Sequence, residues 1–264
     1  MHPDFTKIVE TITRFGYLWS FVSNGQRTDR YLPVMKKYKD NFNNVNLSID
    51  SSIPEIHDAI RRKKGAYQKA IDSAKTYINN GFPVVIKTSL NKMNKSNVEA
   101  IVEHAQILGA TGVVFGGTIP TQWNRHLVLS EIESKELFDE IESRSKDATI
   151  RVETSSSLFT KGGIYFCNNL SLYHLSINQN GEVTFCCDIR PNVAVLGSLR
   201  TNPLTELIKR RLEYSTALQQ YRVDMINTGN LEELFDSCAF VIPIALTFSQ
   251  GFRRRRGWVC RGFP

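Results

Sequence analysis

The sequence predicts an α/β protein in which β-strand–α-helix units repeat and are followed by a small β-hairpin plus helix module. Strand-like runs recur roughly every 25 to 40 residues, with helical patterns between them. This alternation is typical of a parallel sheet or barrel with right-handed crossovers. The character of the sequence changes after residue 153, where Ser155-Ser156-Ser157 and Lys161-Gly162-Gly163 form a linker.

The individual elements follow from hydrophobic periodicity and from their end signals. We expect helices over 4–15, 29–38, 66–79, 96–108 and 130–143, and strands over 17–23, 44–50, 83–90, 112–115 and 149–153. Gly16, Asn80-Gly81 and Gly109 mark helix ends. Ser130 and Glu133 have the spacing of a capping box.

The front of this array looks incomplete. Only about four strong strands precede residue 120, and the chain opens on a helix with no strand before it. Because a closed barrel needs more strands, and a helix in such an array covers a preceding strand, we expect a partial barrel.

The second part of the chain predicts a hairpin and a helix. A strand over 172–177, a turn over 178–181 and a strand over 182–187 form the hairpin, and 203–215 is helical. We therefore expect three regions, 1–153, 154–240 and a tail over 241–264.

Composition excludes several classes of protein. No run of about 18 apolar residues exists, so no membrane span is expected. The N-terminus lacks a signal-peptide pattern, which predicts a cytoplasmic protein without membrane contact. Five cysteines in such a chain favour metal ligation or free thiols over disulfides.

The net charge of +7 belongs mostly to the tail, which carries five arginines and no Asp, Glu or Lys. The tail also lacks a helix or strand pattern. This favours a frameshifted or otherwise foreign tail over a binding surface for RNA or an acidic partner. Nucleic acid is therefore not the expected partner, although Phe252 and Trp258 flank the Arg run and could stack on bases.

The stretch 46–67 predicts a ligand site. A strand ends at Ser48-Ile49-Asp50, and a helix opened by Pro54 then carries His57, Asp58, Arg61 and Arg62. In α/β proteins ligands bind at the carboxyl ends of the strands, so hydroxyl, carboxylate and guanidinium groups would meet at one rim. The alternatives are an ordinary loop with a capped helix and, for Arg61, a surface ion pair.

The cysteines near the hairpin suggest a metal centre. Cys167 precedes Gly181 by 13 intervening residues, and Cys186 follows Gly181 after four. A tight turn at Gly181 would bring both thiolates to one metal, for which zinc or an iron–sulfur cluster is suited. The alternative is that these cysteines are small buried hydrophobes.

In order and spacing, these segments together resemble the radical S-adenosylmethionine (SAM) superfamily, with a C-terminal SPASM or twitch auxiliary-cluster domain. The matching segments are His2-Pro3-Asp4-Phe5, Ser23-Asn24-Gly25, Ser48-Ile49-Asp50, His57-Asp58, Arg61, Lys64-Gly65-Ala66-Tyr67, Thr88 to Asn94, Gly112 to Phe115, Cys167-x13-Gly181-x4-Cys186, Val195 to Leu199 and Pro203-Leu204. By this resemblance the chain is a partial (βα)6 barrel holding that family's strands 3–6.

The resemblance implies specific roles. Ser48 would contact the SAM ribose and Arg61 the SAM carboxylate, with Asn24, Asp50 and Thr88 lining the barrel mouth. Cys167 and Cys186, with Cys238 as a further ligand, would hold an auxiliary 4Fe–4S cluster. The intact enzyme would modify a peptide, protein or small molecule, with flavodoxin or ferredoxin as electron donor.

Two departures from the family pattern limit this interpretation. The CxxxCxxC motif that holds the catalytic 4Fe–4S cluster is absent, as is the GGEP motif, and no cysteine precedes Cys167. Val241 stands where a CX2C pair opened by Cys238 needs its second cysteine. We therefore expect a fragment that does not cleave SAM by itself. The alternatives are a non-catalytic metal- or nucleotide-binding module and a basic RNA-binding protein.

Overall fold

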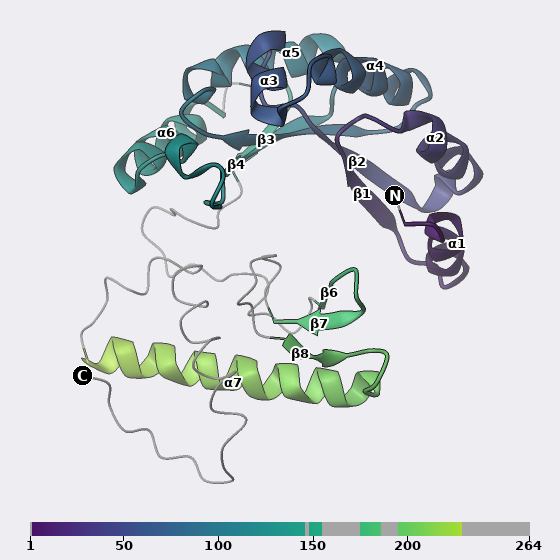
Figure 1. Ribbon diagram of the computed structural model, residues 1–264, viewed down its shortest axis with the longest axis vertical. Coiled ribbons are helices and arrows are strands. Elements are labelled where there is room, and N and C mark those ends of the chain that lie inside the picture. Colours follow the sequence, from purple (N-terminus) through teal and green to yellow (C-terminus); the bar gives the residue numbers. More distant parts are fainter. Residues whose placement is uncertain (1, 146–147, 155–174, 186–194, 229–264) are drawn as a thin grey trace. The chain divides into compact units, whose positions relative to one another are not determined.

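The computed structural model describes residues 2–145, 148–154, 175–185 and 195–228 (Figure 1). The chain divides into two compact units, Met1–Ser156 and Ser157–Pro264, and each is described separately.

The first unit is a series of strands and helices in alternation. Its helices and strands are α1 Phe5–Arg14, β1 Trp19–Ser23, α2 Thr28–Lys37, β2 Phe42–Ser48, α3 Pro54–Arg61, α4 Ala66–Asn79, β3 Val84–Leu90, α5 Val98–Leu108, β4 Gly112–Gly117, α6 Glu131–Arg144 and β5 Arg151–Thr154. The predicted α/β class and the predicted helices and strands of this part are confirmed, with boundaries that differ by one or a few residues.

The five strands form one parallel sheet in the order β1-β2-β3-β4-β5. The sheet is bent into an arc, and the helices of this unit lie on its outer side (Figure 1). Because every strand runs in the same direction, all the carboxyl ends of the strands lie at one edge of the sheet. The predicted site residues Ser48 and Asp50 lie at that edge, at the end of β2.

Alternation along the strands separates the two faces of the sheet. In β3, Val84, Ile86 and Leu90 are buried under the helices together with Thr88, whereas Lys87 between them is exposed. Val45 and Leu47 of β2 follow the same rule. The core therefore lies between the sheet and its outer helices.

The end signals read from the sequence are present in the structure. Gly16, Gly81 and Gly109 all have positive φ at the helix ends, a conformation that costs a residue with a Cβ about 1–2 kcal/mol. The Ser130 side chain accepts a hydrogen bond from the Glu133 backbone N–H, and the Glu133 carboxylate accepts one from the Ser130 backbone N–H, which completes the predicted capping box of α6.

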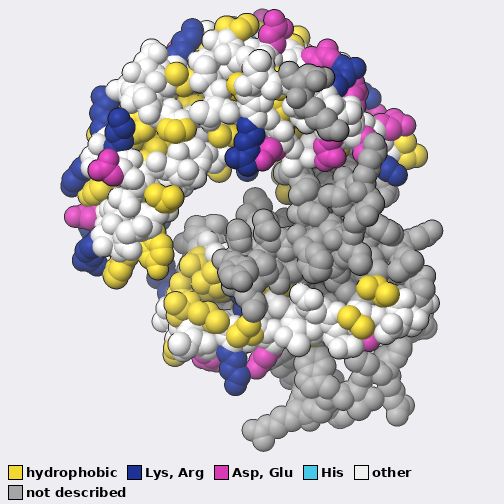
Figure 2. Space-filling view, turned by 180° about the vertical axis from the view of Figure 1, so that it is seen from behind, with side chains coloured by type: hydrophobic (Ala, Val, Ile, Leu, Met, Phe, Trp, Pro, Cys, Tyr) yellow, Lys and Arg dark blue, Asp and Glu magenta, His cyan; other side chains and the backbone are white. Residues whose placement is uncertain are grey.

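One edge of the sheet exposes apolar side chains. β1 is the first strand in the order and has a neighbour on one side only. Tyr17, Leu18 and Val22 are each more than 60% exposed, and Phe15 at the end of α1 is 66% exposed. Hydrophobic side chains are visible in Figure 2 at the end of the arc where α1 and β1 lie.

The second unit contains β6 Ser176–Ile177, β7 Glu182–Thr184, β8 Val195–Ser198 and the long helix α7 Leu204–Thr228. β6 and β7 pair antiparallel, and Gly181, with φ +78°, donates a backbone hydrogen bond to Asn178 in the turn between them, so the predicted hairpin is confirmed. The prediction that the last helix ends near Ser215 is wrong. The helix continues through 217–228, where helix-forming residues follow a short Ser-Thr interruption.

None of the helices described here is long and apolar enough to cross a membrane.

Gly25 provides a test of how closely α4 approaches the loop after β1. Both Gly25 and Gly16 have φ +74°, but a Cβ on Gly25 would lie 2.7 Å from Ala70 Cα, whereas Gly16 has open space around it. We expect Gly16→Ala to cost about 1–2 kcal/mol of unfolding free energy. Gly25→Ala should cost about 1–3 kcal/mol more, because α4 must shift. Equal losses for the two variants in urea unfolding would contradict this packing.

Candidate functional site

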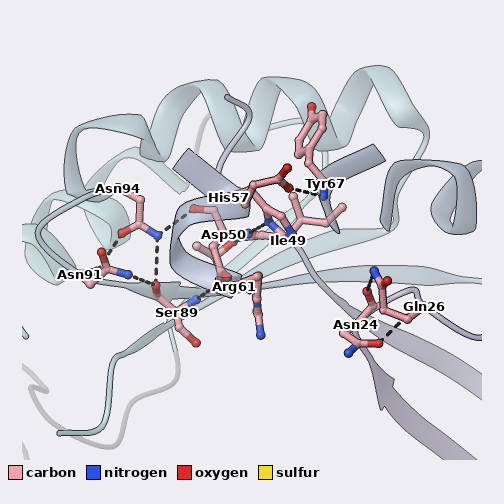
Figure 3. Close-up of polar contacts among 12 residues, drawn as sticks. Asn24, Gln26, Ile49, Asp50, His57, Arg61, Tyr67, Ser89, Asn91 and Asn94 are labelled. Atoms are coloured by element: carbon pink, nitrogen blue, oxygen red, sulfur yellow. Dashed lines mark hydrogen bonds and ion pairs between the residues drawn. The ribbon is translucent and has the colours of Figure 1, made fainter. Parts of the chain in front are cut away.

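The candidate site lies at the carboxyl ends of β2 and β3, in the loops over 49–53 and 91–97 (Figure 3). Buried polar side chains are concentrated there, including Asp50, Ser51, His57, Asn91 and Asn94. Burying polar groups is unfavourable unless they are paired, so the site is best described through the partners of its most strongly buried charge.

Asp50 is that charge, and its side chain is fully buried. Its Oδ1 accepts a hydrogen bond from the Ser89 backbone N–H at 3.1 Å, and its Oδ2 lies 2.5 Å from Arg61 Nε. The second contact is an ion pair whose atoms are not aligned as a hydrogen bond. Asp50 therefore joins the end of β2 to both β3 and α3.

Arg61 reaches Asp50 from the last turn of α3, and its side chain is 32% exposed. In the described part of the chain, its two terminal nitrogens make no hydrogen bond or ion pair. A planar guanidinium that is held through Nε keeps two parallel N–H donors, which suit a carboxylate. Arg61 is thus fixed at one end and available to a ligand at the other.

His57 supports the same loop from α3. It is buried, and its Nδ1 accepts a hydrogen bond from the Asp50 backbone N–H at 3.1 Å, so the neutral ring carries its proton on Nε2. Burial lowers the pKa of His57; the charge of Asp50 opposes this shift and that of Arg61 adds to it. The ring is a positioning group for Asp50.

Asp58 and Arg62 are the other charged residues of the predicted rim, and Asp58 is directed to the start of α4. Asp58 accepts hydrogen bonds from the backbone N–H groups of Gly65 and Tyr67, where α4 begins, and the bond from Tyr67 is the main reason why its pKa is lowered. Arg62 ends α3 in the left-handed conformation, with φ 53°. Of the charges on this segment, Asp50 and Arg61 form the site.

Three asparagines of the β3–α5 loop were missed by the sequence analysis. Asn94 Nδ2 donates to Asp50 O at 2.7 Å and to Ser89 O at 3.0 Å, and its Oδ1 accepts from Asn91 N. Asn97 Oδ1 accepts from the hydroxyl groups of Ser51 and Ser52. These bonds tie the two loops together. The spacing of Asn91, Asn94 and Asn97 directly after a strand was the available signal, because short amides bond to nearby backbone groups.

The remaining predicted ligand contacts have different surroundings. Ser48, the last residue of β2, is half-buried, and its hydroxyl has no partner among the described residues. Thr88 is buried and donates its hydroxyl hydrogen to Ile49 O at 2.6 Å, so it links β3 to β2. Asn24 is exposed and bonds to Gln26, apart from the Asp50 group (Figure 3).

The predicted metal ligands Cys167, Cys186 and Cys238 lie outside the described residues. Within the described ranges, no group of three or more His, Cys, Asp or Glu side chains is placed to hold a metal ion.

An open parallel sheet with a buried carboxylate, a poised guanidinium and a free hydroxyl at its carboxyl edge defines an α/β domain suited to a small polar ligand. Residues 1–108, from the start of the chain to the end of α5, match the family model of the Radical SAM superfamily. No curated protein matches the sequence.

Solved structures share the fold. SuiB of Streptococcus suis bound to S-adenosylmethionine aligns over 78% of this chain with a TM-score of 0.62 and 12% identity. The enzyme anSMEcpe with bound AdoMet and the Kp18Cys peptide aligns over 80% with a TM-score of 0.54 and 17% identity. SuiB bound to the precursor peptide SuiA aligns over 70% with a TM-score of 0.51 and 12% identity.

This chain covers only part of those proteins. It spans 51% and 46% of the two SuiB chains and 65% of the anSMEcpe chain.

The buried His57 predicts that stability depends on pH. Since its pKa is below the ordinary 6.5 in the folded protein, the unfolded chain binds a proton first as the pH falls. Stability should therefore be fully present above pH 6.5 and decrease below it, towards the lowered pKa. Urea unfolding of the full chain between pH 7.5 and 5 measures this slope.

His57→Asn keeps an acceptor for the Asp50 N–H and removes the titration, so its slope should be shallower than that of the wild type. Burial also lowers the pKa of His104, and His104→Gln determines that share of the slope. Parallel slopes for the wild type and His57→Asn would contradict the assignment.

Proposed function

We propose that this chain belongs to a radical SAM enzyme and that its first unit binds S-adenosylmethionine at the carboxyl edge of the sheet. The observation that carries the proposal is the geometry of Arg61, which is held by the buried Asp50 and whose terminal nitrogens have no partner among the described residues. The family match of residues 1–108 and the fold shared with AdoMet-bound structures support it.

The two free groups suit the two polar parts of this ligand. Arg61 would bind the methionyl carboxylate through two parallel hydrogen bonds, and the Ser48 hydroxyl would bond to the ribose. Asp50 would not contact the ligand. It positions Arg61, while His57 and Asn94 hold the Asp50 backbone. A side chain that is already ordered loses less conformational entropy when it binds.

The catalytic cluster of the family does not fit residues 1–154. A 4Fe–4S cluster needs thiolate ligands, and the first cysteine of the sequence is Cys167. We therefore derive no step through that cluster, and the role proposed for the first unit is to bind and orient SAM.

For the second unit we propose an auxiliary 4Fe–4S cluster held by Cys167 and Cys186, with Cys238 as a further ligand. Support comes from the order of these cysteines around Gly181 and from the antiparallel pairing of β6 with β7, which reverses the chain at that glycine. A cluster bound there would supply an electron-transfer centre.

The proposed substrate is a peptide or protein. Two of the matching structures, SuiB with the precursor peptide SuiA and anSMEcpe with the Kp18Cys peptide, hold peptides on a related fold. In an intact enzyme, flavodoxin or ferredoxin would supply the electrons.

A non-catalytic SAM-binding module is the second candidate, and the absence of any cysteine before Cys167 favours it. Both candidates require the same ligand contacts. They differ in whether reduction of the iron-loaded protein in the presence of SAM releases 5′-deoxyadenosine.

The Arg61 contact predicts a specific loss of affinity. Arg61→Met should weaken SAM binding by roughly 10- to 100-fold, as expected for a hydrogen-bonded charge of about 1.5–3 kcal/mol. Arg61→Lys should recover only part of this, because a point charge cannot form two parallel bonds. Isothermal titration calorimetry with SAM measures both effects.

Arg62→Met is the matched control, since Arg62 is the neighbouring exposed arginine and should bind SAM like the wild type. The proposal fails if the full chain does not bind SAM, or if Arg61→Met and Arg62→Met bind it equally.

The auxiliary cluster predicts a coloured protein. Anaerobic reconstitution with iron and sulfide should give brown visible absorbance in the wild type. Cys167→Ala and Cys186→Ala should each reduce the bound iron and the colour, because each removes a thiolate ligand. Cys260→Ala is the control outside the proposed ligand set. An uncoloured wild type, or loss of colour only with Cys260→Ala, would overturn the assignment.

A further inference from the structure

The inner face of the sheet, opposite the helices, carries several polar groups, of which the proposed SAM site uses only Ser48. Register places Ser48 of β2 beside Lys87 of β3, and Lys87 beside Val114 of β4, with Glu153 of β5 next along this row. Residues paired across parallel strands project to the same face, so these side chains share the face opposite the buried core. No helix of the first unit's described part lies on it (Figure 1).

Lys87 is the one charged side chain on this face within β1 to β4. It is exposed, and its ammonium group has no hydrogen bond or ion pair among the described residues. On β5 the two charges of this face, Arg151 and Glu153, pair with each other. Among the described residues, this face thus holds one cation, Lys87, without a partner.

Uncharged polar groups without partners lie next to this cation. Asn46 is half-buried in β2 on the same face, and its amide makes no hydrogen bond in the described ranges. Ser48, with its free hydroxyl, is the residue paired with Lys87, about 4.8 Å away across the strands. A hollow of about 200 Å³ is lined by residues of β2 to β5 that include Asn46, Val114 and Glu153, but not by Lys87 or Ser48.

We infer that this face is the substrate surface and that Lys87 selects a peptide carrying an acidic side chain near the position to be modified. The inference rests on the proposed function, because it takes the substrate to be a peptide. An unpaired ammonium recruits a carboxylate, and a free amide such as that of Asn46 can bond to the peptide backbone. Since Ser48 is the neighbour of Lys87 and also the proposed ribose contact, the acidic residue would lie next to the bound SAM.

The test uses charge preference in peptide binding, measured separately from SAM affinity. The probes are three pools of acetylated nonapeptide amides with Glu, Gln or Lys fixed at the centre and Gly, Ala, Ser and Val mixed elsewhere. Peptides retained by the immobilised full chain in the presence of SAM are quantified by mass spectrometry. The Glu pool should exceed the Gln pool by about fivefold, which is the upper range for an ion pair at a partly exposed site.

Charge reversal makes the result independent of simple loss of folding. Lys87→Met should remove the preference, and Lys87→Glu should favour the Lys pool over the Glu pool. Lys69→Glu, an exposed position on the outer helix α4, is the matched control and should behave like the wild type.

The inference is overturned if the wild type retains no pool, shows no charge preference, or keeps the same preference in Lys87→Glu. If the wild-type chain still binds SAM when the peptide test fails, the proposed function is unaffected. Loss of SAM binding with a preserved charge switch would instead refute the proposed function alone.

Discussion

The buried carboxylate of Asp50 is the constraint on which the rest of the site depends. A carboxylate removed from water must be compensated, and an uncompensated one would cost several kcal/mol. Here the compensation comes from Arg61 on α3 and from the Ser89 backbone on β3. Because Asp50 follows β2 and its two partners come from α3 and β3, satisfying one charge fixes the end of β2, the end of β3 and the orientation of α3 together.

In this arrangement, the residues that hold the loops in place differ from the residues that would contact a ligand. The loops at the carboxyl edge are held by side chains that face the protein, namely His57 and the asparagines of the β3–α5 loop. The groups left for a ligand, the Arg61 terminal nitrogens and the Ser48 hydroxyl, belong to residues whose backbones are thereby fixed. The affinity for SAM should therefore depend on residues that do not contact it. Mutating only the contact residues would miss these supporting residues.

Local rules accounted for most of the fold but not for the polar network. Strand alternation, positive-φ glycines and the Ser130–Glu133 capping box are short-range signals, and each predicted its element. Ser48 and Arg61 were proposed from motif resemblance, whereas the cross-links of Asn94 to Asp50 and of Asn97 to Ser51 join residues 44 and 46 positions apart, beyond the reach of local rules. Helix α7 exceeded its predicted length because a weak local interruption does not end a helix whose flanks both favour it.

The strand order has a consequence for how the domain opens. β2 and β3 have hydrogen-bonded neighbours on both sides, whereas β1 and β5 are the edges of the sheet. Backbone amides of a doubly paired strand exchange with deuterium only when larger parts of a domain unfold, and those of edge strands exchange through small local openings. The residues proposed to hold SAM and to read the peptide are therefore carried by the slowest-exchanging strands, so the ligand site would persist while both margins of the sheet fray.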